Sequence, residues 1–348
     1  MSSTTGPLTR LLLGLAVGIV ACAGRASSPA SAAPAQPPAA LLPTRVLARA
    51  QTPAPVGATN AARVKKRWEA AAGGFGRAVA VSQQRRQVAY SNGEEVLLYD
   101  LRQGQRQRAV SEACKQVVRG GLAYAGHRLL IVCEGAAQVV SGPGAPAREL
   151  PIAASPVTAV SFSGEWIAIG HHDGVVRVYS ATGGDPVEVP VPGPPIDVKS
   201  LALSPDGRRV AVAWVQGSIW WWDLAAPSDP HPLVRHPSES DAIAFSASGD
   251  FLAEEGATKT TTVWSFAGAP REAHKIQNGA WVKSLHFTRD GKWLVRGGSD
   301  GLELAEIAGP QRVALDTRGA VEDVALDEDG ATIAAVDRDG RLTVWAAR

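Results

Sequence analysis

Short apolar stretches alternate with turn residues along most of this chain, and the alternation repeats about every 40 residues. The clearest copies are 198–207, 282–291 and 321–330. The glycine that closes the first turn recurs at positions 207, 249, 291 and 330, with steps of 42, 42 and 39. An aromatic residue ends a later strand of most units, at Tyr99, Tyr179, Trp222, Trp264 and Trp345. Two of its steps, 80 and 81, each span one degenerate unit, so the pattern predicts seven units.

Asp-Gly pairs mark the turns between the strands. They occur twice in each of the last two units, at 290–291 and 300–301, and again at 329–330 and 339–340. Asp-Gly supplies the positive φ angles of tight hairpin turns, and this spacing leaves room for one strand of about six residues. Each unit is therefore predicted to fold into one four-stranded sheet. Because one such sheet buries little surface alone, the expected fold is all-β, a seven-bladed propeller whose blades cover one another.

These units resemble those of the WD-repeat (Trp-Asp repeat) β-propeller family, over roughly 75–348. One unit keeps the Trp-Asp pair, at Trp222 and Asp223, whereas the others end Tyr-Asp, Tyr-Ser, Trp-Ser or Trp-Ala. The family's His before the first strand has one match, His236, but its partner Asp in the later turn is absent from 258–260. The resemblance implies a divergent member of the family.

The last unit has no outer strand of its own after Trp345. The segment 63–69, just ahead of the first unit, lies where that strand is expected to come from. Closing the ring in this way removes an exposed sheet edge and ties the two ends of the fold together. We therefore expect the propeller to occupy 63–348, closed by a strand from before blade one.

The N-terminus predicts export. Arg10 precedes an apolar run at 11–20 that is too short to span a membrane and is typical of a signal peptide. The sequence Ile-Val-Ala-Cys at 19–22 resembles the bacterial lipobox, which implies a signal peptide over 1–22 and lipid attachment at Cys22. The alternative is an ordinary signal peptide cleaved after Ala21 or nearby. In a Gram-negative cell, Ala23 after the cysteine implies a lipoprotein of the outer membrane that faces the periplasm.

The segment 23–62 is rich in Ala, Pro and Ser and is predicted to be a disordered linker that tethers the propeller to the cell envelope. A basic run follows at 63–67. We interpret it as a solvated strand edge, with contact to anionic lipid or polymer as the alternative. The formal net charge of +2 predicts no broad basic surface and no nucleic-acid partner.

Two cysteines remain besides Cys22, and both fall in the second unit, at Cys114 and Cys133. In the fold that the chain resembles, the loop before a blade's first strand lies beside the turn after its second strand. These cysteines occupy those two places, so the resemblance implies a disulfide between them in an oxidising compartment. Two free buried thiols are the alternative.

The sequence contains little that indicates catalysis, and we predict no catalytic residues, no cofactor and no metal. The segment 297–301 matches the Gly-x-Ser-x-Gly pattern, but it lies between two predicted strands, so we interpret it as a hairpin turn. The consecutive His171, His172 and Asp173 lie in a strand and turn and cannot all face one ion. The tryptophans at 220–222 are interpreted as packing between blades, because alternation along a strand sends neighbours to opposite faces.

A partner is expected to bind where the inner strands begin, around the central channel. Counting back six residues from a shared apolar position gives one residue per unit: Phe75, Val118, Pro156, Asp197, Glu239, Trp281 and Ala320. Among them Phe75, Asp197, Glu239 and Trp281 form a predicted partner-binding rim for a peptide or a basic loop, since aromatic anchors dominate such interfaces. The alternative is that these residues merely start strands.

Two functions are compatible with the sequence. The first is a non-catalytic platform for protein–protein interaction, a monomeric propeller anchored to the membrane through Cys22. The second is a propeller hydrolase or lyase that acts on a small molecule or glycan in the channel. The count places only Asp197 and Glu239 there as candidate acids and bases.

Overall fold

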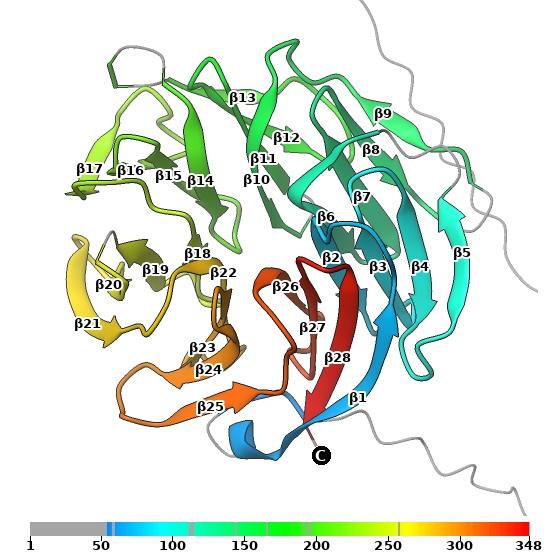
Figure 1. Cartoon of the computed structure of the whole chain (residues 1–348). Helices are drawn as coiled ribbons and strands as arrows, with labels where there is room; N and C mark the ends of the chain where they lie inside the picture. Colours follow the sequence, from blue (N-terminus) through cyan, green and yellow to red (C-terminus); the bar gives the residue numbers. More distant parts are fainter. Residues whose placement is uncertain are drawn as a thin grey trace, which may run out of the picture. The chain divides into compact units, whose positions relative to one another are not determined.

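The computed structural model describes residues 54–57, 60–110, 115–142, 145–164, 166–190, 192–193, 196–256 and 258–347. They form seven four-stranded antiparallel sheets arranged as blades around a central channel (Figure 1). The predicted seven-bladed propeller is therefore confirmed.

Each blade takes its strands in chain order from the channel outward. Blade one contains β2 (Ala78–Ser82), β3 (Gln87–Ser91), β4 (Val96–Asp100) and β5 (Arg106–Val110). Blade two contains β6 (Val117–Ala125), β7 (Arg128–Cys133), β8 (Ala136–Val140) and β9 (Arg148–Leu150). Blade three contains β10 (Val157–Ser163), β11 (Trp166–His171), β12 (Val176–Ser180) and β13 (Val187–Val189). Blade four contains β14 (Val198–Leu203), β15 (Arg209–Trp214), β16 (Ser218–Asp223) and β17 (His231–Arg235).

The remaining blades follow the same order. Blade five contains β18 (Ile243–Phe245), β19 (Phe251–Gly256), β20 (Thr260–Ser265) and β21 (Arg271–Gln277). Blade six contains β22 (Val282–Phe287), β23 (Trp293–Gly298), β24 (Gly301–Glu306) and β25 (Arg312–Leu315). Blade seven contains β26 (Val321–Leu326), β27 (Thr332–Asp337) and β28 (Arg341–Ala347), and its outer strand is β1 (Val64–Ala71).

Ring closure by β1 is confirmed. This strand pairs with β28 from Val64 opposite Ala347 to Ala71 opposite Arg341. Trp68 of β1 also fastens blade seven to blade one, because its indole nitrogen donates a hydrogen bond to the Leu101 carbonyl at 2.8 Å. The ends of the fold are thus joined through backbone pairing and through packing between blades.

The core lies between neighbouring blades, so the middle strands are buried on both faces. The triple tryptophan of β16 illustrates this arrangement. Trp222 is fully buried and packs, with Trp220, among residues of blades three and four. Trp221 packs on the other face, toward blade five. The interpretation of these tryptophans as packing between blades is therefore confirmed.

Asp-Gly turns behave as the repeat predicts. Gly291 and Gly330 both have φ of +67°, which is costly for residues with a side chain. In the β27–β28 turn, the Asp337 carboxylate accepts hydrogen bonds from the backbone N–H groups of Asp339 and Arg341, at 3.0 and 2.8 Å. In this turn Gly340 supplies the positive φ, of +74°, and Asp337, two residues before the Asp-Gly pair, satisfies the exposed donors.

The packed fold begins before β1. Val56 is fully buried and its N–H donates to the Gly330 carbonyl at 2.7 Å, and the short 3₁₀ helix η1 (Ala61–Arg63) follows. The expected boundary between 62 and 63 thus lies inside a packed segment. The predicted signal peptide, Cys22 and most of the predicted linker lie outside the described residues. Within the part of the chain that the structure describes, no helix is long and apolar enough to cross a membrane.

Cys133 ends β7, is buried and is disulfide-bonded. Its predicted partner, Cys114, lies outside the described residues, so the pairing stays a prediction.

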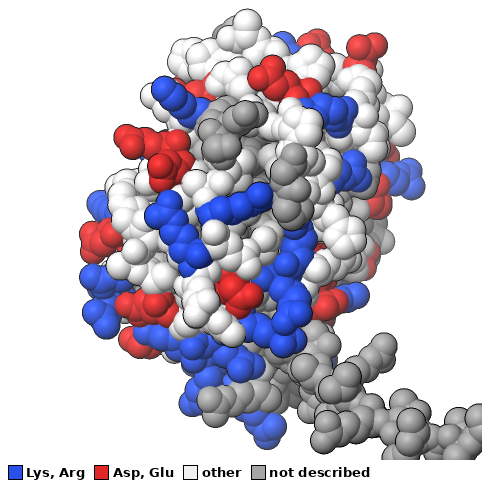
Figure 2. All heavy atoms as spheres, turned by 90° about the vertical axis from the view of Figure 1, so that its right-hand side faces the viewer, with Lys and Arg blue, Asp and Glu red and all other residues white. Residues whose placement is uncertain are grey.

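Positive charge is concentrated on one side of the ring. Residues 60–150 carry fourteen Lys and Arg against seven Asp and Glu, although the whole chain has a net charge of only +2. Figure 2 shows many of these basic side chains on the side of the ring that faces the viewer. Lys65 and Arg67 of β1 are exposed, whereas Lys66 pairs with Glu69 and Asp316. This local excess of basic residues is not apparent from the net charge of the whole chain.

Candidate partner-binding surface

The central channel has two mouths, and only one of them is bordered by the starts of the inner strands. Since the seven inner strands run in the same direction along the channel, their first residues meet at one end, which we call the N-terminal mouth. The channel itself is a cavity of about 420 Å³ lined by all seven inner strands. Residues of the N-terminal mouth are therefore brought together from every blade.

β-bulges in the inner strands direct charged side chains toward this mouth. In blades three, four, six and seven the pairing with the second strand skips one residue near the start of the inner strand. The skipped residues are Thr158, Lys199, Lys283 and Glu322. A bulge leaves one residue unpaired and re-aims its side chain. Thr158, Lys199 and Lys283 consequently line the channel.

Lys199 is held by two carboxylates of the next blade. Its Nζ lies 2.9 Å from Asp241 Oδ1 and 3.1 Å from Glu239 Oε2. Burial is the largest single influence and lowers the pKa of Lys199, but the hydrogen bonds to Asp241 and Glu239 together raise that pKa above its ordinary value. The lysine therefore stays charged and joins blade four to blade five.

A second charged cluster joins blades six and seven. Lys283 Nζ lies 2.7 and 2.8 Å from the two carboxylate oxygens of Glu322, and Arg338 Nε donates to Glu322 Oε1 at 3.0 Å. Burial alone raises the pKa of Glu322, but these two cations lower it below its ordinary value overall. Glu322 is thus an ionised, buried anchor for both cations.

Phe75 and Trp281, which we call the aromatic rim, lie at the N-terminal mouth on either side of blade seven. Their exposed fractions are 42% and 43%. Phe75 has the guanidinium carbons of Arg77 and Arg338 at 5.4 and 5.8 Å from its ring centroid, and Trp281 has Lys259 Nζ at 5.7 Å. The rings face solvent and cations rather than the core.

The backbone around Trp281 is fixed by the turn of its own blade. Its N–H donates to Ser299 Oγ at 3.2 Å, and its carbonyl accepts from the Ser299 N–H at 3.0 Å. A Cβ on Gly298 would lie 2.0 Å from the Trp281 carbonyl oxygen, so this position requires glycine. The segment 297–301 is indeed a hairpin turn between β23 and β24, and its Gly and Ser position an exposed tryptophan.

The two predicted acidic rim residues lie at the same mouth but are paired with neighbours. Asp197 Oδ1 lies 2.7 Å from His172 Nδ1, and Glu239 pairs with Lys199. Both acids are substantially exposed, so each pair contributes little to stability. Val118, the residue that the count gave for blade two, lies near the start of β6 but is buried between blades two and three, next to a wide bulge.

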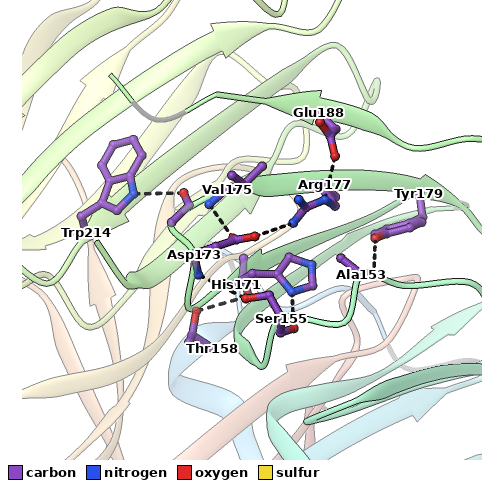
Figure 3. A network of polar contacts seen from close by, with 12 residues as sticks. Ala153, Ser155, Thr158, His171, Asp173, Val175, Arg177, Tyr179, Glu188 and Trp214 are labelled. Atoms are coloured by element: carbon purple, nitrogen blue, oxygen red, sulfur yellow. Dashed lines mark hydrogen bonds and ion pairs between the residues drawn. The ribbon is translucent and has the colours of Figure 1, made fainter. Parts of the chain in front are cut away.

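Blade three contains a polar network, drawn in Figure 3, in which His171 and Asp173 have separate partners. His171 is buried, and its Nδ1 donates to the Ser155 carbonyl at 2.8 Å, while burial lowers the pKa of His171 and keeps it neutral. Asp173 accepts from the Val175 N–H and from Arg177. With His172 turned to Asp197, the three consecutive residues do not converge. The described residues include no cluster of three or more His, Cys, Asp or Glu that suits a metal ion.

His236 has a different partner from the one that the family pattern provides. Its Nε2 lies 2.9 Å from Glu254 Oε2 of β19, a fully buried carboxylate, and this hydrogen bond raises the pKa of His236. The imidazole thus ties the loop before blade five to its second strand.

Asp323 is the most buried acid of the channel wall. Burial raises its pKa to about 6. Its oxygens accept hydrogen bonds from the Val79 N–H at 2.9 Å and from Ser284 Oγ at 3.2 Å. His286, also in the wall, has its pKa lowered to about 4 by burial. These groups hold the inner strands of blades six, seven and one together.

Comparison with known proteins agrees with the geometry of the blades. The family described as "WD domain, G-beta repeat" matches residues 144–180, which cover β9 and the first three strands of blade three. This segment is similar to a single WD repeat, and the whole described fold is a seven-bladed β-propeller. Propellers built from WD repeats are typically protein-interaction scaffolds.

A curated relative and a solved structure are similar to parts or to the fold of this propeller. The "Periodic tryptophan protein 2 homolog" of Schizosaccharomyces pombe is 38% identical over 71 residues, which is 20% of this chain and 8% of that protein. A chain in the "Crystal Structure of Mitotic Checkpoint Complex" superposes with a TM-score of 0.69 over 82% of this chain and 96% of its own length. At 16% identity, this second similarity concerns the fold alone.

Proposed function

We propose that this WD-repeat propeller is a non-catalytic platform for protein–protein interaction, anchored to the bacterial cell envelope through lipid on Cys22, and that its partner binds the aromatic rim. The observation that carries the proposal is the exposure of Phe75 and Trp281 at one mouth of the channel. Large aromatic side chains supply most of the binding energy at protein interfaces, and exposing them to water without a partner is unfavourable.

The distribution of exposed apolar residues supports the choice of this mouth. Among the described residues, four large apolar side chains are exposed: Phe75, Trp166, Val215 and Trp281. Val215 also belongs to the N-terminal mouth, because its N–H donates to the Asp197 carbonyl at 3.2 Å. Trp166 begins β11 and lies at the opposite end of the blades. Three of these four residues therefore gather where the inner strands begin.

Charged residues between the two aromatics favour a specific partner. Arg338, Glu322 and Lys283 form a continuous chain of contacts across blade seven, from Phe75 on one side to the blade of Trp281 on the other. A partner that covers both rings also covers this chain. Such a mixture of aromatic anchors and polar neighbours is typical of non-obligate protein interfaces.

The test of rim binding is a cross-linked pull-down from detergent-solubilised membranes, read by mass spectrometry. We expect wild type to recover a defined envelope protein that the variant Phe75→Ala/Trp281→Ala loses. The matched control is Trp166→Ala, which removes an equally exposed aromatic from the opposite side and should keep the partner. Equal recovery by the rim variant and the control would refute the proposal.

The anchor requires a separate measurement. Cys22→Ala should move the protein from the membrane fraction to the soluble fraction and abolish labelling by a fatty-acid analogue, because the lipid attaches through the thiol. Unchanged labelling of the variant would show that Cys22 is not the site of attachment.

A further inference from the structure

Arg119 projects into the channel from an irregular part of β6. The pairing of β6 with β7 passes from Val117 opposite Cys133 directly to Leu122 opposite Ile131. Four residues, 118–121, therefore oppose Val132 alone, whereas the bulges of the other inner strands skip a single residue. This wide bulge places Arg119 among the residues that line the cavity.

Two glycines make the wide bulge possible. Gly120 has φ of +67°, a left-handed conformation that favours glycine. A Cβ on Gly121 would lie 2.5 Å from the Val132 carbonyl oxygen, so the backbones approach too closely for any side chain. The Gly120 N–H donates to the Arg77 carbonyl of blade one at 3.2 Å and fixes the bulge to the neighbouring blade. Arg119 is therefore held in place by the backbone.

The guanidinium of Arg119 reaches across the channel to blade five. Its Nη2 donates to the backbone carbonyl of Asp241 at 3.1 Å, a contact between residues 122 positions apart. A guanidinium has five N–H donors in a planar fork that matches a carboxylate. Among the described residues this carbonyl is the only hydrogen-bond partner of the side chain, so most of its donors remain available.

Arg119 differs in this respect from the other cations of the channel wall. Lys199 is paired with Asp241 and Glu239, and Lys283 with Glu322. Across the described residues, Arg119 forms no ion pair within 4.0 Å. The charge of Arg119 acts on Asp323, where it opposes the rise in pKa that burial causes. The Asp323 oxygens accept hydrogen bonds from the Val79 N–H and from Ser284 Oγ. A half-buried guanidinium that makes no direct ion pair among the described residues is only partly compensated by the charge of Asp323, and a ligand carboxylate can add a direct pair.

We propose that Arg119 receives the carboxylate of an Asp or Glu side chain from the peptide segment that docks on the aromatic rim. The inference rests on the proposed function and adds the chemistry of the partner, an acidic peptide. A cavity of about 420 Å³ has room for one inserted side chain. Within the channel wall, the acid forms a charge-assisted pair with the guanidinium fork, while the aromatic rim holds the flanking residues.

The test is selection of peptides from a random heptapeptide display library on the purified full-length chain. Wild type should select peptides enriched in Asp or Glu that compete with one another for a single site. The charge-reversed variant Arg119→Glu should lose this enrichment. The matched control is Arg271→Glu, which makes the same change in net charge at an exposed position of β21 and should select acidic peptides as wild type does.

A selected peptide then gives the size of the interaction. Arg119→Gln should weaken its binding at least about tenfold, as expected for loss of a hydrogen-bonded charge. A Glu→Gln change in the peptide should cause a similar loss on wild type and little further loss on Arg119→Gln, because both changes remove one contact. Thermal unfolding checks that each variant is folded.

The outcomes separate this inference from the proposed function. Acidic peptides that bind Arg119→Gln as tightly as wild type, or selected peptides without acidic enrichment, overturn the role of Arg119. If those peptides still need Phe75 and Trp281, rim binding stands. If no peptide is selected, or if selected peptides bind the rim variant Phe75→Ala/Trp281→Ala unchanged, the rim proposal fails and the role of Arg119 fails with it.

Discussion

Replacing Glu255 by glutamine is expected to stabilise the propeller by about 3 kcal/mol at pH 8 but by only about 1 kcal/mol at pH 5. Glu255 lies on β19 with an exposed fraction of 2%. Burial raises its pKa from 4.5 to about 7, although the Thr261 hydroxyl and the Asn278 amide donate hydrogen bonds to the carboxylate at 3.1 and 2.7 Å. These donors do not offset the loss of hydration.

The sign follows from proton linkage. Because the pKa of Glu255 is higher in the folded state, folding favours the protonated form. The stability that this group contributes is complete below about pH 4.5 and is lost as the pH rises to about 7. The difference between these two pKa values corresponds to about 3 kcal/mol. Glutamine keeps an oxygen for Thr261 and Asn278 but has no charge to bury, so its advantage grows over this pH range.

Urea unfolding of wild type and Glu255→Gln at pH 5, 6.5 and 8 measures the effect, and effects of other titrating groups largely cancel in the difference. The control is Glu272→Gln on β21, an exposed residue paired with Lys275, for which we expect a change within about 0.5 kcal/mol at every pH. The reasoning is refuted if Glu255→Gln destabilises the protein at pH 8, or if its effect is the same at pH 5 and pH 8.

Three further predictions test the fold and the setting of the rim. A chain lacking β1 should melt at a much lower temperature than the full chain, because β28 then becomes an open edge, and an unchanged melting temperature would contradict closure by β1. Gly298→Ala should shift the Trp281 backbone and weaken partner binding, whereas Gly135→Ala, with nothing within 4 Å of its added Cβ, should not; equal binding by both variants would contradict the contact. Thiol titration of the denatured, unreduced mature protein should detect neither Cys114 nor Cys133, and two titrating thiols would exclude the predicted disulfide.

Much of the fold could be predicted because its turn and strand residues recur at a regular interval along the sequence. The Asp-Gly turns recur at nearly constant steps, and each fixes the backbone locally. The same period placed Phe75 and Trp281 at the starts of inner strands, where the structure has them exposed. Closure by β1 was also predictable, since a sheet with three strands needs a fourth.

The charged part of the mouth could not be predicted by counting along regular strands. A bulge adds one unpaired residue to a strand. The side chains of Lys199, Lys283 and Glu322 therefore do not follow the regular alternation of faces that counting along a strand assumes. One signal was nevertheless present: the paired residues Lys283 and Glu322 are 39 positions apart, one repeat, and have opposite charge. A comparison of the charged residues that lie one repeat apart, in addition to the apolar ones, would have identified this pair. Arg119 would still be missed, because its wide bulge has no counterpart in the other blades.

Site-specific photo-crosslinking in living cells of the native organism tests the central claim most directly. A photoreactive phenylalanine analogue replaces Trp281 in one strain and Trp166 in another, so that two similarly exposed positions on opposite sides of the blades are compared. We predict one defined crosslinked partner from position 281 and none from position 166. The absence of a crosslink from position 281, or the same product from both positions, would contradict a partner-binding surface at the N-terminal mouth.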